Sequence, residues 1–250
     1  MSTSTEERRQ GGISTSQIEY QMRFRDLIAR AARQPGPELK KKTFDQFLTI
    51  SREAGSRGAE VAQWMGDRLG WAVLDKNLVD RLAGDLELQP RVLEVLDETR
   101  INWFSETLLN LFNSRLVAQQ GYVELLGKVI ALAATSEPVV IVGRGAHLIL
   151  PPEAGLRVRV IAPRAWRVQW LAASEGLELQ AAEKRVDVID ADRRAFVSRN
   201  FRHESADASA YDLVLNAASL GVDGCVEVIK RALDVGGLVC IDRPVGRRRE

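Results

Sequence analysis

The chain has 250 residues, of which 45% are hydrophobic and 28% are charged, as in an ordinary globular protein. Its 35 basic and 34 acidic residues leave a net charge of +1, so no global field indicates nucleic acid or a membrane surface as a partner. Two cysteines exclude a disulfide framework, and two histidines add too few ligands for a typical structural zinc site. No run approaches the roughly 18 apolar residues of a membrane span. The polar N-terminus does not resemble a signal peptide, and we expect a cytoplasmic protein.

Residues 1–43 are expected to precede the ordered domain. Residues 1–15 are rich in Ser, Thr, Gly and charge and are predicted to be disordered. Ser16 could cap a short helix, which ends before a Pro-Gly-Pro stretch and a lysine run in the predicted linker 34–43. The apolar face of this helix would comprise Phe24, Leu27, Ile28 and Ala31.

Beyond the linker, predicted strands alternate with helices, which indicates a parallel sheet covered on both faces. The predicted strands are 46–51, 72–75, 138–143, 157–162 and 212–216, with a last one at 238–241. Residues 76–135 are predicted to be almost wholly helical, and two charged helices are expected at 163–175 and 178–200. We therefore expect a three-layer α/β domain over 44–240, followed by a basic tail at 241–250.

A glycine-containing turn, Gly55-Ser56-Arg57-Gly58, lies between the first predicted strand and the next helix. Such a turn is a potential anion site, because a helix N-terminus presents free N–H groups and glycine lets a phosphate approach the backbone. Taken alone the turn is weak evidence, since it lacks the GxxxxGK[ST] pattern of a P-loop. Its context adds weight, because enzymes that transfer a phosphoryl group between two nucleotides place a helical insertion and an arginine-rich lid after the corresponding strands.

Six short motifs follow one another over residues 44–235. They are Thr49 to Val61 (TISREAGSRGAEV), Leu74-Asp75-Lys76 with Arg81, Val142 to Ala146 (VGRGA), Arg157 to Pro163 (RVRVIAP), Arg185 with Asp190-x-x-Arg193-x-x-Phe196, and Tyr211 to Asn216 (YDLVLN). Each is weak alone, but their order and spacing resemble the cytidylate kinase-like family, a divergent relative of bacterial CMP kinase. The resemblance implies the P-loop NMP kinase fold, with a helical acceptor lobe at 76–135 and a helical lid at 174–204.

The resemblance implies that the first turn holds the donor phosphates of ATP. Its cradle would comprise Gly55, Ser56, Arg57, Gly58, Ala59 and Glu60. Gly58 lies where a standard P-loop has its lysine, and Glu60 lies where it has the hydroxyl that binds Mg²⁺. Mg²⁺ would then be held largely through water, with Glu60 as a contributor. Arg57 replaces a usual glycine, and it either returns the missing positive charge or fills the space that a phosphate needs.

The resemblance also implies the acceptor contacts. The residues expected to bind the monophosphate are Asp75, Arg81, Arg144 and Asp190. Arg144 lies between two glycines after a predicted buried strand, which is where open α/β sheets bind ligands. For Arg81, an ordinary exposed arginine is an equally good interpretation. Bacterial CMP kinases have an aspartate where this chain has Gly145, which leaves the base specificity open.

Three arginines are implied to be catalytic, namely Arg144, Arg185 and Arg193. They would neutralise charge on the transferring phosphoryl group, since the planar fork of guanidinium matches phosphate oxygens. An ordinary solvated helix is the alternative interpretation of the lid segment. His147 and His203 are expected to be structural or exposed.

The expected activity is transfer of the γ-phosphoryl group of ATP to CMP or a similar nucleoside monophosphate. No general base is required, because the acceptor phosphate oxygen is already ionised. The missing lysine, Arg57 and Gly145 favour an alternative, a catalytically inactive nucleotide-binding or interaction protein on the same fold. A kinase for another small phosphate acceptor also stays open, since 76–135 is the least recognisable segment. The sequence identifies no protein partner.

Overall fold

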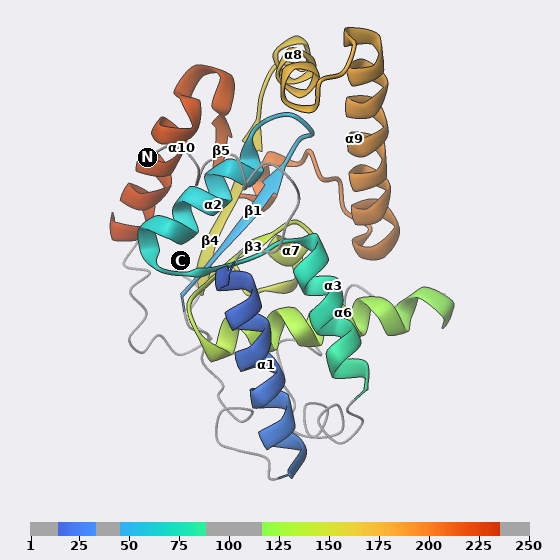
Figure 1. Cartoon of the computed structure of the whole chain (residues 1–250), viewed down its shortest axis with the longest axis vertical. Helices are drawn as coiled ribbons and strands as arrows, with labels where there is room; N and C mark the ends of the chain where they lie inside the picture. The colour runs from blue at the N-terminus through green and yellow to red at the C-terminus, as the bar shows by residue number, and fades with distance from the viewer. Residues whose placement is uncertain (1–14, 34–45, 89–116, 236–250) are drawn as a thin grey trace.

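A computed structural model describes residues 15–33, 46–88 and 117–235 of the chain (Figure 1). Five parallel strands form one sheet in the order β2-β3-β1-β4-β5. They are β1 (Phe47–Arg52), β2 (Ala72–Leu74), β3 (Val139–Val142), β4 (Gly155–Ile161) and β5 (Leu213–Asn216). The parallel α/β sheet is thus confirmed, and each of these strands begins and ends within two residues of its prediction. The strand predicted at 238–241 and the tail at 241–250 lie outside the described residues.

Helices cover both faces of the sheet and make the fold three-layered (Figure 1). They are α1 (Thr15–Arg33), α2 (Gly58–Leu69), α3 (Lys76–Glu87), α6 (Val117–Ser136), α7 (Ala146–Ile149), α8 (Arg164–Glu175), α9 (Leu179–Phe201) and α10 (Ala217–Val235). Alternate residues of β1 point to opposite faces, as in any strand. Leu48 and Ile50 pack in the core under α2 and α10, whereas Phe47 belongs to the core formed with α1, α3, α6 and α7.

Helix α1 is part of the main core. Tyr20, Phe24 and Ile28, spaced four residues apart, are buried in the cluster that also contains residues of α3 and α6. The Gln17 side chain donates a hydrogen bond to the carbonyl of Val73 in β2, at 3.2 Å. This helix was expected to precede the ordered domain, whereas in the structure it packs on α3 and β2.

Helices α8 and α9 stand beyond the carboxyl end of the sheet, beside the loop that follows β1 (Figure 1). A small separate core joins the two helices and includes Ala54 of that loop. Helix α9 falls within the predicted lid segment 174–204, whereas nearly all of α8 precedes it. We call α8 and α9 together the lid helices. Of the predicted acceptor lobe, α3 and α6 are described, whereas 89–116 lie outside the described residues. Among the described helices, none has the length and apolar character needed to cross a membrane.

Candidate functional site

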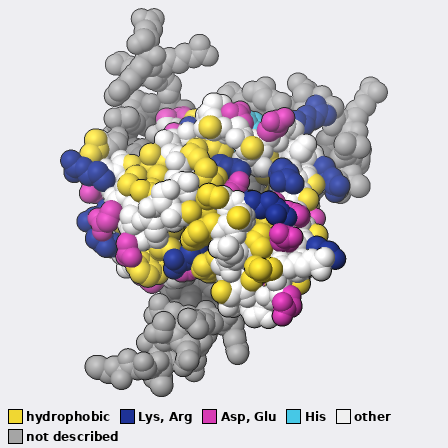
Figure 2. Space-filling view, turned by 90° about the horizontal axis from the view of Figure 1, so that it is seen from above, with side chains coloured by type: hydrophobic (Ala, Val, Ile, Leu, Met, Phe, Trp, Pro, Cys, Tyr) yellow, Lys and Arg dark blue, Asp and Glu magenta, His cyan; other side chains and the backbone are white. Residues whose placement is uncertain are grey.

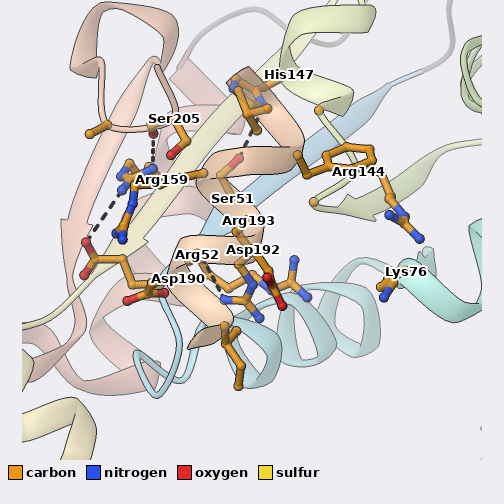
Figure 3. A pocket seen from close by; sticks show the side chains of 18 of the residues that line it. Ser51, Arg52, Lys76, Arg144, His147, Arg159, Asp190, Asp192, Arg193 and Ser205 are labelled. Atoms are coloured by element: carbon orange, nitrogen blue, oxygen red, sulfur yellow. Dashed lines mark hydrogen bonds and ion pairs between the residues drawn. The ribbon is translucent and has the colours of Figure 1, made fainter. Parts of the chain in front are cut away.

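A cavity of about 540 Å³ lies at the carboxyl ends of β1, β3 and β4 (Figure 3). Seven basic side chains line it: Arg52, Lys76, Arg144, Arg159, Arg167, Arg193 and Arg194. They come from β1, β4, α3, the loop after β3 and both lid helices, so distant parts of the chain converge here. Such a concentration of basic groups in a concave site suits an anion with several charges.

The face of the molecule seen in Figure 2 carries charges of both signs. Figure 2 shows one face of the molecule, on which Lys and Arg side chains are interleaved with Asp and Glu side chains. A broad nucleic-acid surface would instead be expected to carry a basic patch or stripe. On this face the arrangement fits a small anionic ligand better.

The lid helices hold the turn after β1 directly. The N–H of Ala54 donates to Oδ1 of Asp190 at 2.8 Å, and Nη1 of Arg167 donates to the Ala54 carbonyl at 2.9 Å. Arg167 and Asp190 also form an ion pair at 2.6 Å, with exposed side-chain fractions of only 9% and 12%. Gly55 permits this approach, since a Cβ there would lie 2.5 Å from the carbonyl oxygen of Arg167. The carboxylate of Asp190 thus accepts a hydrogen bond from the turn, as an anionic ligand would.

None of the six predicted cradle residues, 55–60, lines the cavity, which is lined instead by the preceding residues 51–53. Arg57 forms two hydrogen bonds with the carboxylate of Glu60, at 3.0 and 2.7 Å. These hydrogen bonds raise the pKa of Arg57. Arg57 therefore does not line the cavity, and its charge is paired with that of Glu60.

Arg144 connects the cavity to a second hollow of about 530 Å³ between α6 and α9. Its guanidinium pairs with Asp80 and lies 5.0 Å from the centre of the Phe196 ring and 5.9 Å from that of Tyr122. The Tyr122 hydroxyl donates to the same aspartate at 2.9 Å. The Nε of Arg144 is buried and has no hydrogen-bond partner among the described residues. Arg144 can therefore still donate to a ligand.

Gly145 has a steric explanation. A Cβ at this position would collide with the ring of Phe201, the last residue of α9. An aspartate here would require the Phe201 ring to move, and it would also have to adopt the φ of 70° that Gly145 has. The local packing, rather than the loss of a contact alone, accounts for this departure from the pattern.

The structure brings only some of the predicted residues to the cavity. Arg193 lines it and donates to the carbonyl of Arg52 at 2.9 Å, and burial lowers the pKa of Arg193. Arg185 does not line it, pairs with Glu175 and has 53% of its side chain exposed. Two further predicted residues also lie outside the lining. Arg81 donates to a carbonyl of its own helix, and Asp75 caps α3 by accepting from the N–H of Leu78.

Seven charged residues of the cavity were not predicted as site residues. They are Arg52, Glu53, Lys76, Arg159, Arg167, Asp192 and Arg194. Glu53 lies 3.6 Å from Arg159 and 3.3 Å from Arg167, measured between the charged atoms, and Arg159 also donates to the carbonyl of Ser205 (Figure 3). The alternation of Arg157 and Arg159 within an apolar strand was the available signal, because a charged residue at the carboxyl end of a covered strand lies where ligands bind.

His147 is a buried residue of the cavity wall. It is 4% exposed, its Nδ1 lies 3.3 Å from the Ser51 hydroxyl, and its ring stacks on Tyr211 at 4.7 Å between centroids. Burial lowers the pKa of His147 to about 3, and the charges of His203, Arg157 and Arg159 act in the same direction. The imidazole is therefore neutral at physiological pH.

Comparisons with known proteins agree on one family. The model of the cytidylate kinase-like family matches residues 47–219. A cytidylate kinase of Thermococcus sibiricus is 33% identical over 102 residues, which are 41% of this chain and 52% of the relative. A cytidylate kinase of Methanopyrus kandleri is 27% identical over 120 residues, 48% of this chain and 58% of the relative. The chain thus spans about half the length of the curated relatives that it matches.

One solved structure shares the fold. The crystal structure of an uncharacterized protein from Eubacterium ventriosum is similar with a TM-score of 0.63 at 21% identity. The similarity covers 78% of this chain and 99% of that protein. It includes nearly the whole of the other protein, so the two chains share their fold.

Proposed function

We propose that this chain, which belongs to the cytidylate kinase-like family, transfers the γ-phosphoryl group of ATP to CMP or a similar nucleoside monophosphate. The observation that carries the proposal is the convergence of seven basic side chains on one cavity at the carboxyl edge of the sheet. A donor and an acceptor phosphate brought together there carry several negative charges. Neutralising and aligning them is what a phosphoryl-transfer site must do.

The acceptor would occupy the hollow beside Arg144. Its base would contact Tyr122 and Phe196, and its phosphate would reach the guanidinium of Arg144 in the main cavity. The free Nε of Arg144 supports this placement, because a buried donor without a partner is costly unless a ligand satisfies it. The acceptor phosphate oxygen attacks in its ionised form, so the neutral His147 need not act as a base.

The donor phosphates would lie over residues 51–53 and under the lid arginines. Arg193 lines this part of the cavity, and removal of such an arginine typically lowers kcat by about 10³- to 10⁵-fold in phosphoryl-transfer enzymes. The contact between Asp190 and Ala54 occupies a backbone N–H of the same turn. We therefore expect the lid helices to shift when ATP enters, and ATP should change hydrogen exchange over 174–204.

Mg²⁺ would enter on the phosphates of ATP. The described residues contain no cluster of three His, Cys, Asp or Glu side chains suited to a metal ion. Glu60 is paired with Arg57, and Glu53 and Asp190 are paired with arginines. The cation would therefore be held by phosphate oxygens and water, where it offsets charge on the β and γ phosphates.

A coupled assay for ADP formation with CMP, UMP, AMP and GMP tests the proposal. We expect turnover with at least one of them, CMP being the leading candidate. Arg144→Ala should abolish most of this turnover while the protein stays folded by circular dichroism. The matched control is Arg185→Ala, which removes an arginine outside the cavity lining. No turnover with any of the four acceptors would reject the proposed activity.

A second candidate function is nucleotide binding without catalysis. Two observations favour it. The predicted cradle residues 55–60 do not line the cavity, and Asp190 already accepts a hydrogen bond from the N–H of Ala54 in the turn. A thermal-shift measurement with ATP and CMP separates the two functions when combined with the assay. Ligand at 100 times its dissociation constant adds about 2.7 kcal/mol of stability, so binding without turnover would be readily detected.

A further inference from the structure

Compared with a standard P-loop, positions 52 and 58 of this chain have exchanged a glycine and a basic residue. In the pattern GxxxxGK the lysine follows the first glycine by six residues. With Gly58 at the lysine position, the first glycine corresponds to position 52, which is Arg52 in this chain. This chain thus has an arginine, Arg52, at the position of the first P-loop glycine. It has a glycine, Gly58, at the position of the P-loop lysine.

The geometry shows that the two changes depend on each other. A Cβ at Gly58 would lie 2.5 Å from the Cβ of Arg52 and 3.2 Å from its Cγ. The two positions therefore cannot both carry a side chain in this backbone geometry. The same Cβ would also lie 3.2 Å from the Cβ of Val160, a close contact that does not depend on Arg52. At the other end of Arg52, a Cβ at Gly143 would lie 2.5 Å from Nη1. The side chain of Arg52 thus extends from the turn after β1 to the end of β3, and it passes a glycine at each end.

We propose that Arg52 supplies the phosphate-binding positive charge that a P-loop takes from its lysine, and that its guanidinium binds the phosphoryl group in transit from ATP to the acceptor. This role rests on the proposed function. In the reaction, the bond from the γ phosphorus to the β–γ bridging oxygen breaks, and ADP keeps its electron pair. A bond from the same phosphorus to an ionised acceptor oxygen forms, so no proton has to move. Arg52 contributes charge and hydrogen bonds only.

The neighbourhood of Arg52 supports this role. Four other cavity arginines already donate to protein acceptors: Arg144, Arg159, Arg167 and Arg193. The guanidinium of Arg52 has no hydrogen bond or ion pair within the described part of the chain, although it lines the cavity (Figure 3). Burial lowers the pKa of Arg52 to about 9, with Arg193 and Arg144 acting in the same direction and Asp75 opposing them. An anion among these arginines would relieve their mutual repulsion.

The sharpest test changes the residues at positions 52 and 58, first singly and then together. Arg52→Ala should lower kcat/KM for ATP by at least about a hundredfold, and Arg52→Lys should lose less because it keeps the charge. The double variant Arg52→Gly with Gly58→Lys restores the P-loop arrangement and should recover at least a tenth of the wild-type value. Arg30→Ala is the control for loss of an exposed arginine outside the cavity lining. Arg52→Ala within about threefold of wild type would overturn the assignment, as would a folded double variant no better than Arg52→Ala.

Binding of ATP by calorimetry separates this inference from the proposed function. If the wild type binds ATP but transfers nothing, the proposed activity fails, and Arg52→Ala should still weaken ATP binding by at least about tenfold. Equal ATP affinity of the wild type and a folded Arg52→Ala variant would overturn the role of Arg52 alone. A wild type that neither binds ATP nor turns it over would overturn both.

Discussion

The guanidinium of Arg57 and the carboxylate of Glu60 share two hydrogen bonds on the first turn of α2, at 3.0 and 2.7 Å. This pair, rather than a phosphate, explains why an arginine is tolerated at a helix N-terminus, since the carboxylate offsets its charge. It also removes Glu60 from the residues that could approach a metal ion. Arg57 therefore does not supply charge to the cavity, whereas Arg52, six residues before Gly58, is one of the seven basic residues that line it.

Arg57→Gly should be more stable than Arg57→Ala by about 1–2 kcal/mol, as measured by chemical denaturation. Arg57 has a φ of 61°, a left-handed conformation that glycine adopts without strain and alanine does not. Both variants lose the half-exposed pair with Glu60, so the difference isolates the backbone. ATP affinity should stay within about twofold of wild type in both, and a larger change would place Arg57 in the donor site after all.

Arg193→Gln should lower kcat by at least about a hundredfold, whereas Arg185→Ala should leave it within about twofold. The two arginines belong to the same helix, but Arg193 lines the cavity and Arg185 pairs with Glu175 outside the lining. Steady-state kinetics with saturating ATP makes the comparison. Similar losses in both variants would show that α9 acts through its overall charge rather than through one side chain.

Asp190→Asn should destabilise the fold by about 1–3 kcal/mol, because it removes the charge that pairs with the buried Arg167. Asp192→Asn, an exposed change two residues away on the same helix, should stay within about 0.5 kcal/mol of wild type. Urea unfolding curves for the two variants provide the measurement. Equal stabilities would mean that the lid helices are not fastened to the turn through Asp190.

Stability should fall in acid because of His147. Its pKa is lowered from 6.5 to about 3 in the folded protein, so between these values the unfolded chain binds more protons. The free energy of unfolding should therefore decrease as the pH falls below about 6, by up to about 1.4 kcal/mol per pH unit. His147→Gln should flatten this dependence. An unchanged slope in a folded variant would show that the imidazole is protonated in the native state.

The fold could be predicted because the sequence patterns that define its strands and helices are local. The continuous apolar runs of β1 and β3 and the glycine that ends α2 identify the elements, and their alternation identifies the parallel sheet. The packing of α1 could not be predicted, since the spacing of Phe24 and Ile28 defines an apolar face but not the helix that it meets.

The site was less predictable because it depends on contacts between distant residues. The role proposed for Arg52 rests on its fit between Gly58 and Gly143, and no local sequence pattern contains the contact with Gly143. For the same reason the motif could not show that Arg185 faces away from the cavity while Arg193 lines it. The pair of Arg57 with Glu60 was accessible from sequence, because residues three apart on a helix are neighbours.

The products of a single incubation with ATP, Mg²⁺ and CMP test the central claim most directly. Chromatographic separation of the nucleotides measures ADP and CDP in the same sample. If the arginine-lined cavity transfers the γ-phosphoryl group, one CDP appears for each ADP, and both are lost in Arg144→Ala. ADP without a matching nucleoside diphosphate, or no product with CMP, UMP, AMP or GMP, would contradict the account.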